Sequence, residues 1–184
     1  FKSLLATGAW SSGGDLGTAR YLVAGAGTQT AGLAFGGLSD PSTNTNVTEE
    51  YNGSGWSNGG NLSTTRRNLG GAGTQTAGLG FGGRTPSADT NTTEEYGGTS
   101  WTAGGNMGTA RQALAGAGTQ TAGLGIAGYV TGTGFINTSE EYGGTSWTAG
   151  GSLATAVGAL AAAGTQTAGL SFGGNAPSVS TAMA

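Results

Sequence analysis

The sequence predicts an all-β protein built from four copies of one short-stranded unit. The heptapeptide Gly-Thr-Gln-Thr-Ala-Gly-Leu occurs four times without change, at residues 27–33, 73–79, 118–124 and 164–170. One tryptophan accompanies each copy, at Trp10, Trp56, Trp101 and Trp147, and both series step by 46, 45 and 46 residues. A repeat of roughly 40–50 residues is typical of propellers and solenoid arrays. We therefore expect one domain over residues 1–184 with a period of about 46 and no linker.

Each unit is predicted to contain four strands, called A to D in chain order. In the first full unit, an apolar run over residues 21–27 predicts strand A, and a turn at 28–30 leads to strand B at 31–35. After a polar loop, residues 46–51 predict strand C, and Trp56 marks strand D. Helices are not expected, because no segment keeps helical apolar spacing free of internal glycine. Four short strands per unit are the content of one propeller blade.

Composition limits the chemistry that is available. The chain of 184 residues contains 41 glycines, no cysteine and no histidine, so disulfides, Cys/His zinc sites and imidazole-based catalysis are excluded. Six basic residues and a formal net charge of −3 do not provide the basic surface that nucleic acids require. The sequence contains no apolar run of about 18 residues, so it predicts no membrane span. We expect no cofactor, no nucleic-acid partner and no membrane insertion.

A set of residue types recurs in fixed order: a glycine doublet after strand B, a tyrosine, a tryptophan about five residues later, and an arginine. The doublets are Gly36-Gly37, Gly82-Gly83 and Gly173-Gly174, with Ala127-Gly128 in the third unit, and the tyrosines are Tyr51, Tyr96 and Tyr142. This combination resembles the kelch repeat over the whole chain. The resemblance implies a β-propeller but leaves activity open, because kelch propellers serve as enzymes, adaptors and adhesins. The repeats are also similar to kelch-type repeats of marine phages and metagenomic bacteria, which resemble tail-fibre or virion-surface modules.

The two ends of the chain are complementary parts of one blade. Residues 1–14 align with strands C and D, and residues 157–174 supply only strands A and B. We therefore expect a kelch-like propeller with four blades of four antiparallel strands, closed when the N-terminal hairpin completes the last blade. The alternative is half of a larger ring that a second copy closes.

The composite blade lacks two charged features that the other three share. Val157 replaces the arginine, and Ser3 and Leu4 replace a pair of glutamates. This joint loss suggests that the charges balance within each blade. We expect no direct contact between arginine and glutamate, because strand B separates strands A and C by about 9–10 Å.

Three Glu-Glu-Tyr triplets offer the paired carboxylates that glycoside hydrolysis requires. Adjacent residues of a strand point to opposite faces, so each pair is split. Three equal copies also fit a structural ladder better than one active site. We therefore expect no enzymatic activity and keep a glycosidase as a second alternative.

Arg20, Arg66 and Arg111 recur at the expected start of strand A. Their guanidinium groups can face an anionic ligand or bind backbone carbonyls as structural ties. The tryptophans allow a similar choice between stacking on a sugar and packing between blades, and their strict period favours packing. Asp and Asn side chains in the loops suit calcium, but their spacing matches no known calcium loop, so no metal site is predicted.

The repeats differ most between strands B and C. The A–B turn is identical in every unit, whereas each B–C loop is different, and antiparallel strands place all B–C loops on one rim with the D–A connections. Variable loops on a rigid scaffold are the usual construction of a binding surface, and the third loop is the most apolar. The candidate binding residues are Tyr129, Phe135, Ile136, Arg84, Asp89, Asp40, Arg20, Arg66 and Arg111.

The sequence therefore predicts a binding or structural module. Our leading interpretation is a phage virion or tail-fibre component that attaches to a host-surface glycan or docks to another virion protein. The alternative is a secreted or cell-surface bacterial propeller for adhesion or protein interaction. A homo-oligomer is compatible with both.

Overall fold

The computed structural model describes residues 12–40 and 42–177, and every helix or strand in them is a β-strand. The all-β prediction is thus confirmed. Three antiparallel sheets of four strands follow one another along the chain, and each has its strands in the predicted A-B-C-D order. They consist of β1 (Ala24–Thr28), β2 (Ala31–Phe35), β5 (Thr48–Tyr51) and β6 (Trp56–Asn58); β7 (Gly70–Gly73), β8 (Gly78–Phe81), β9 (Thr93–Tyr96) and β10 (Trp101–Ala103); and β11 (Ala115–Gly118), β12 (Gly123–Val130), β13 (Gly134–Tyr142) and β14 (Trp147–Ser152).

Two smaller sheets complete the described residues. β15 (Ala161–Gly164) pairs with β16 (Gly169–Phe172), which corresponds to strands A and B of a fourth unit. β3 (Leu38–Ser39) and β4 (Thr43–Asn44) form a short hairpin within the first B–C loop. The strands C and D expected near Phe1–Leu5 and Trp10 lie outside the described residues.

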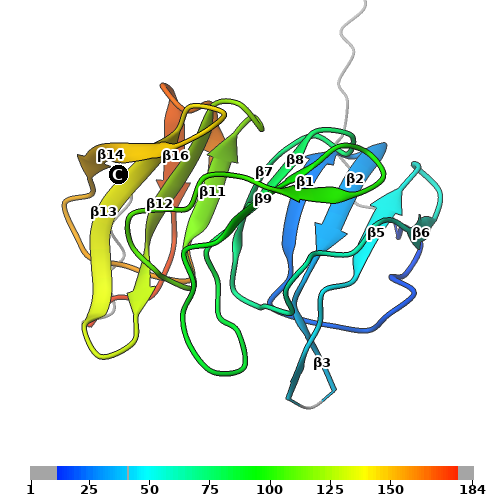
Figure 1. The fold of residues 1–184 in the computed structure, drawn as a ribbon, viewed down its shortest axis with the longest axis horizontal. Helices are drawn as coiled ribbons and strands as arrows, with labels where there is room; N and C mark the ends of the chain where they lie inside the picture. Colours follow the sequence, from blue (N-terminus) through cyan, green and yellow to red (C-terminus); the bar gives the residue numbers. More distant parts are fainter. Residues whose placement is uncertain (1–11, 41, 178–184) are drawn as a thin grey trace, which may run out of the picture.

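The sheets lie side by side and meet through their first strands (Figure 1). β1 contacts β7, β7 contacts β11, and β11 contacts β15, while no comparable contact joins β15 to β1 among the described residues. Small residues allow this approach: a Cβ on Gly71 would lie 2.6 Å from the Gly25 carbonyl oxygen. The described residues therefore form a series of adjacent sheets. They do not include contacts that would close this series into a ring.

The invariant Ala-Gly-Leu segment of strand B packs each sheet on the next. The leucine of one sheet lies on the glycine of the following sheet, so that a Cβ on that glycine would meet the leucine Cδ2 at only 2.6–2.8 Å. The pairs are Leu33 on Gly78, Leu79 on Gly123 and Leu124 on Gly169. The same tripeptide provides both partners, which explains why it recurs without change.

Tryptophans fill the remaining space between successive sheets. The Trp101 ring lies 4.8 Å from the ring of Phe35, and its indole N–H donates to Thr48 Oγ1 at 2.9 Å. Trp147 repeats the arrangement with Phe81 at 4.8 Å and Thr93 Oγ1 at 2.9 Å. Both rings are thus held between sheets, away from the position of a sugar-stacking platform.

The third B–C segment is a hairpin and not the loop that we expected. β12 and β13 continue to Val130 and Gly134, with Tyr129 opposite Phe135. Aromatic and β-branched residues extend the ladder, and the two glycines at 132 and 134 adopt positive φ in the tight turn. Only residues 131–133 remain as a turn between the strands.

Candidate functional site

The B–C segments of the first three units lie on one rim of the molecule. In Figure 1 the β3–β4 hairpin, the connection from β8 to β9 and the tip of the β12–β13 hairpin all project to the lower side. The A–B turns lie at the other ends of the same strands. We call the lower surface the variable rim, because its B–C segments differ in every repeat.

Backbone bridges bring two variable positions of each unit together on this rim. The residue after the repeated arginine pairs with the first residue after the glycine doublet. The four bridges are Tyr21 with Leu38, Arg67 with Arg84, Gln112 with Tyr129, and Gly158 with Asn175. No residue type repeats within either of these two aligned positions, although the residues before them are nearly constant.

Polar side chains from these positions join three units on the variable rim. Arg84 Nη1 lies 2.8 Å from Asp89 Oδ1 and donates to Thr131 Oγ1 at 2.9 Å. Asp89 also accepts from Gln112 Nε2 at 3.0 Å and from the Thr131 backbone N–H at 2.7 Å. Arg67 Nη1 donates to Asn44 Oδ1 at 2.6 Å, and Asn68 Nδ2 donates to Gln112 Oε1 at 3.2 Å. We call this set the rim network: Asn44, Arg67, Asn68, Arg84, Asp89, Gln112 and Thr131.

A run of backbone hydrogen bonds holds the inner part of the rim. Asn68 N–H donates to Leu22 O at 3.0 Å, Ala113 N–H to Asn68 O at 2.8 Å, and Ala159 N–H to Ala113 O at 2.7 Å. These four residues share a left-handed backbone with φ of 53–56°, which is uncommon for residues other than glycine. The recurrence of this conformation fixes the variable residues at equivalent places around the inner strands.

The repeated arginines are buried, and each contacts a glutamate directly. Arg66 Nη2 lies 2.8 Å from Glu94 Oε1, and Arg20 Nη1 lies 2.9 Å from Glu49 Oε1. Arg111 pairs with Glu140 in the same way. Our expectation that strand B would keep these charges apart is therefore wrong, because the arginine extends from the D–A connection past the end of strand B.

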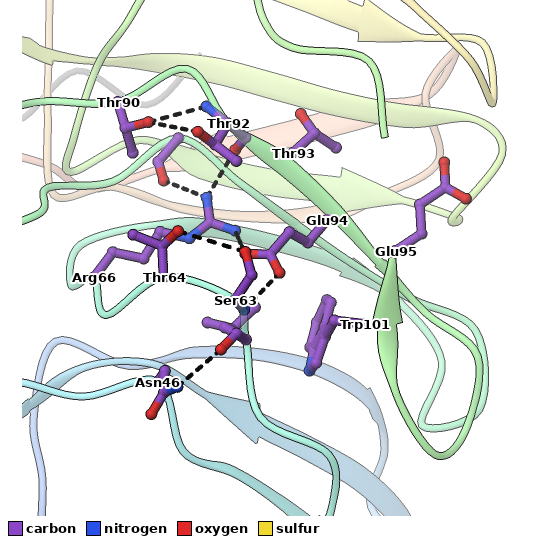
Figure 2. A network of polar contacts seen from close by, with 12 residues as sticks. Asn46, Ser63, Thr64, Arg66, Thr90, Thr92, Thr93, Glu94, Glu95 and Trp101 are labelled. Carbon is purple, nitrogen blue, oxygen red and sulfur yellow. Dashed lines mark hydrogen bonds and ion pairs between the residues drawn. The ribbon is translucent and has the colours of Figure 1, made fainter. Parts of the chain in front are cut away.

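Backbone carbonyls accept further hydrogen bonds from each buried arginine, whose Nε has no hydrogen-bond partner among the described residues. Arg66 Nη1 donates to Gly82 O at 2.9 Å and to Thr92 O at 2.7 Å, and the Ser63 N–H donates to Glu94 Oε2 at 2.8 Å (Figure 2). Arg111 makes the matching bonds to Ala127 O and Thr138 O. Burial lowers the pKa of Arg66, and the charge of Glu94 opposes this shift. These arginines therefore connect parts of a blade and do not present guanidinium groups to the rim surface.

The two glutamates of each triplet have different partners. Figure 2 shows Glu94 directed to Arg66 while Glu95 points away from it. Tyr142 Oη donates to Glu95 Oε1 at 2.5 Å, and Tyr96 Oη donates to Glu50 in the same way. Burial, followed by the hydrogen bond to the glutamate, raises the pKa of each tyrosine to about 12. One carboxylate thus binds within its own sheet and the other binds the next sheet.

The invariant A–B turn also connects neighbouring sheets. Gln75 Nε2 donates to Gly32 O at 3.1 Å and Tyr51 O at 2.7 Å, both in the preceding sheet. Gln120 and Gln166 repeat these two bonds one and two sheets later. The opposite rim therefore has a structural reason to stay constant.

The predicted apolar site residues are half-buried within the β12–β13 hairpin. The rings of Tyr129 and Phe135 meet edge to face at 5.4 Å, and a Cβ on Gly158 would lie 2.9 Å from the Phe135 ring. Ile136 is also half-buried. Of these three, Tyr129 lies nearest the rim network, because its backbone pairs with Gln112.

The loop oxygens considered for calcium have other roles. Asp89 belongs to the rim network, and the Asn91 amide donates to Met107 O at 2.8 Å. Asp40 is exposed in the β3–β4 turn. Within the described residues, no group of three His, Cys, Asp or Glu side chains is placed to hold a metal.

Arg67, Asn68, Gln112 and Thr131 were not among the residues that sequence reasoning selected. The signal was present: Arg67 and Gln112 follow the repeated arginine immediately, and the position differs in every unit. The D–A connection, which pairs with the B–C segments, was not predicted to be part of the site.

No protein-family model matches the chain, and a search of curated proteins found no significant similarity. In the described part of the chain, no helix is present that could cross a membrane.

Proposed function

We propose that this chain is a non-enzymatic binding module built on a closed four-bladed, kelch-like propeller. Its recognition surface is the variable rim, and its ligand is a host-surface glycan contacted by a phage virion or tail fibre. The rim network is the observation that carries this proposal. Among residues 12–40 and 42–177, non-repeating polar residues of three units meet in this network, whereas the repeated arginines and their glutamates form structural contacts.

The chemistry of the rim suits carbohydrate hydroxyl groups. Arg84, Asp89 and Gln112 together offer planar donors and acceptors within hydrogen-bonding distance of one another. Arg84 retains an exposed side-chain fraction of 24%, so its remaining N–H groups can donate to a ligand. Tyr21 and Tyr129 lie at the bridged positions beside the network and add aromatic surface.

The contacts of the glutamates support binding without turnover. A glycosidase needs a protonated and an ionised carboxyl group on either side of one bond. Here Glu94 is ion-paired with Arg66, and Glu95 accepts from Tyr142 on the other face of its strand. Neither glutamate of this pair is placed to act with the other on one substrate.

Location on a virion rests on the similarity of the repeats to kelch-type phage sequences. The bacterial alternative, a secreted or cell-surface adhesion propeller, uses the same rim and differs in the cell that carries the protein. Competition between the purified chain and phage particles for adsorption to bacteria distinguishes the two.

A glycan array tests the proposal directly. We expect the full chain to bind a subset of glycans, and the double variant Arg67→Ala/Gln112→Ala to lose at least about tenfold in affinity, ~1.4 kcal/mol. Thr121→Ala on the opposite rim is the matched control and should bind normally. Release of reducing sugar would contradict the non-enzymatic proposal, and unchanged binding by the double variant would remove the assignment of the rim.

A further inference from the structure

A cavity beside the two-stranded sheet β15–β16 repeats the surroundings of Trp101 and Trp147 without a tryptophan among the described residues. We propose that this cavity is the binding site for the indole of Trp10 from the same chain, with Ser139 Oγ as the acceptor of its N–H. The inference rests on the closed propeller proposed above and specifies the contacts that close it.

The cavity lining matches the two occupied tryptophan sites position by position. Its volume is about 230 Å³, and Ile126, Ser139 and Ser171 are among its lining residues. In the repeat, Ile126 corresponds to the phenylalanines beside Trp101 and Trp147, and Ser171 corresponds to the glycines below them. Since one water occupies about 30 Å³ of liquid, the space admits a large side chain.

Ser139 provides the acceptor that the indole requires. It aligns with Thr48 and Thr93, whose hydroxyl oxygens accept from Trp101 and Trp147 at 2.9 Å. Ser139 Oγ donates its own proton to Gly151 O at 2.5 Å. Its lone pairs therefore remain to accept an N–H. Subtracting one repeat of 46 residues from Trp56 identifies Trp10 as the tryptophan of this unit.

The other face of the half blade lacks its neighbour as well. Leu170 and Phe172 are 54% and 46% exposed, although the equivalent Leu33 and Phe35 are 2% and 0% exposed. At the far end of the series, the three described atoms nearest to a Cβ on Gly32 belong to Thr28, Tyr51 and Trp56, whereas its three equivalents each meet a leucine. Leu170 at one end of the series and Gly32 at the other are the two partners of one further leucine–glycine contact. The two faces are therefore complementary.

The A–B turns give the same result independently. Gln75, Gln120 and Gln166 each donate to two carbonyls of the preceding sheet. Gln29, on the first sheet, makes no such bond to a described residue. The equivalent acceptor for Gln29 is Gly169 O of β16. The sheet β15–β16 therefore fits the position that precedes the first sheet, where Gln29 would donate to it.

The buried charges also place the N-terminal segment in the last blade. Each of the three arginines pairs with a glutamate of its own sheet, and removal of one partner of a buried pair is strongly destabilising. Val157 stands in the arginine position of the last unit, and Ser3 stands in the glutamate position. A glutamate at position 3 would have no arginine there. The joint replacement fits one blade made from both ends of one chain.

The start of the described chain favours the same molecule as the source of Trp10. Gly14 O accepts from the Trp56 indole at 3.0 Å, and a Cβ on Gly13 would lie 3.0 Å from Tyr51 Oη. The described chain thus begins beside Tyr51 and Trp56 of the first sheet, which is the sheet that the half blade has to join.

A pair of engineered cysteines tests the closure. Strand register places Glu49 opposite Ala34 and Glu140 opposite Gly125, which predicts Ser3 opposite Ser171. The chain has no cysteine, so Ser3→Cys/Ser171→Cys in the full chain should form one intramolecular disulfide on mild oxidation, seen as a faster monomer on a non-reducing gel. Thr7→Cys/Ser171→Cys, off register, should form none. A disulfide between two chains would assign Trp10 to a second copy, and absence of any disulfide would overturn the closure; either result defeats the proposal.

A double-mutant cycle tests the indole site itself. If Trp10 donates to Ser139, Trp10→Phe and Ser139→Ala remove the same bond, so the double variant should melt at the temperature of the less stable single variant. The cycle Trp101→Phe with Thr48→Ala calibrates this expectation at an occupied site. Additive melting shifts together with a correct disulfide would leave the closure standing and reject the site. Neither experiment depends on glycan binding, so the two proposals fail separately.

Discussion

Arg66 and Glu94 form an ion pair in the interior, with side-chain exposures of 0% and 2%. Arg66 precedes the first strand of its sheet, and Glu94 lies on the third strand, β9. The pair therefore fastens the D–A connection across the end of the sheet. Gly82 O and Thr92 O accept from Nη1 of Arg66, so these carbonyls and Glu94 compensate the desolvated charge in part, while the Arg66 Nε has no hydrogen-bond partner among the described residues.

Removal of one partner should destabilise the fold strongly. Glu94→Gln leaves the Arg66 charge buried without its counter-ion, so we expect a loss of about 3–5 kcal/mol in the free energy of unfolding. Urea denaturation monitored by tryptophan fluorescence measures this loss.

The last unit suggests the matched control. The double variant Arg66→Val/Glu94→Ser copies the residues Val157 and Ser3 and leaves no buried charge. It should be more stable than Glu94→Gln alone. A double variant that is less stable than Glu94→Gln would show that the pair stabilises the sheet by more than charge compensation.

The invariant glutamine of the A–B turn should contribute to stability through its two amide protons. Gln120 Nε2 donates to Gly78 O at 3.0 Å and Tyr96 O at 2.8 Å. Gln120→Glu keeps the shape and removes both donors, so it should lose about 1–3 kcal/mol. Gln120→Ala should lose a similar amount in thermal melts. A neutral effect of Gln120→Glu would mean that water replaces both bonds.

Alkaline pH should weaken the contacts between sheets. Burial and the bond to a glutamate raise the pKa of Tyr96 and Tyr142 from 10.0 to about 12. The folded state thus holds these two protons more tightly than the unfolded state. Their contribution is complete below pH 10 and is lost as the pH rises from 10 to about 12.

The double variant Tyr96→Phe/Tyr142→Phe tests this dependence. It should be less stable at pH 7, by about 1.5–3 kcal/mol for each lost bond to a charged group. Between pH 10 and 12 its unfolding free energy should fall less than that of the wild type. Equal alkaline slopes in urea titrations would assign the pH dependence to other groups.

The strand order was predictable from the sequence because one pattern repeats four times. The predicted strand B at 31–35 coincides with β2, and the predicted strand C ends with β5 at Tyr51. Strand A was placed too early: residues 21–23 precede β1, because Leu22 adopts a left-handed conformation at the rim. An apolar run of residues does not indicate that one of its leucines has a left-handed backbone.

The candidate site was predictable only in its location. Comparison of the repeats identified the variable rim, and Arg84 and Asp89 belong to its network. The buried position of Arg66 was not predicted, because the separation of strands A and C ignores both the length of an arginine side chain and its place before strand A. The extended β12–β13 hairpin was missed because residues 129–136 were compared with the B–C loops of the other units and taken as a loop, whereas the glycines at 132 and 134 form the turn of a hairpin.

Asp89 is the residue whose loss should affect recognition most specifically. Its carboxylate accepts from Arg84, Gln112 and the Thr131 backbone, and so it holds two B–C segments and one D–A connection together. Its ion pair with Arg84 is partly exposed, and such pairs contribute only about 0–1 kcal/mol. Asp89→Ala also removes the bonds from Gln112 and from the Thr131 backbone, so it should lower the melting temperature, but by less than Glu94→Gln in the fully buried pair. Glycan affinity should fall by at least about tenfold, ~1.4 kcal/mol, because the network loses its common acceptor and Arg84 its orientation.

Asp15→Ala separates this effect from the change in net charge. Asp15 is exposed, and the preceding Gly14 bonds to Trp56 of β6 and not to a residue of the rim network, so its replacement should leave binding unchanged. Titration of an array-identified glycan against both variants by calorimetry provides the comparison. Equal losses for the two variants would indicate a general electrostatic effect, and a normal affinity for Asp89→Ala would place recognition elsewhere. Because the inner rim is held by the backbone bonds between Asn68, Ala113 and Ala159, a selective loss in Asp89→Ala reports the side chains and not the scaffold.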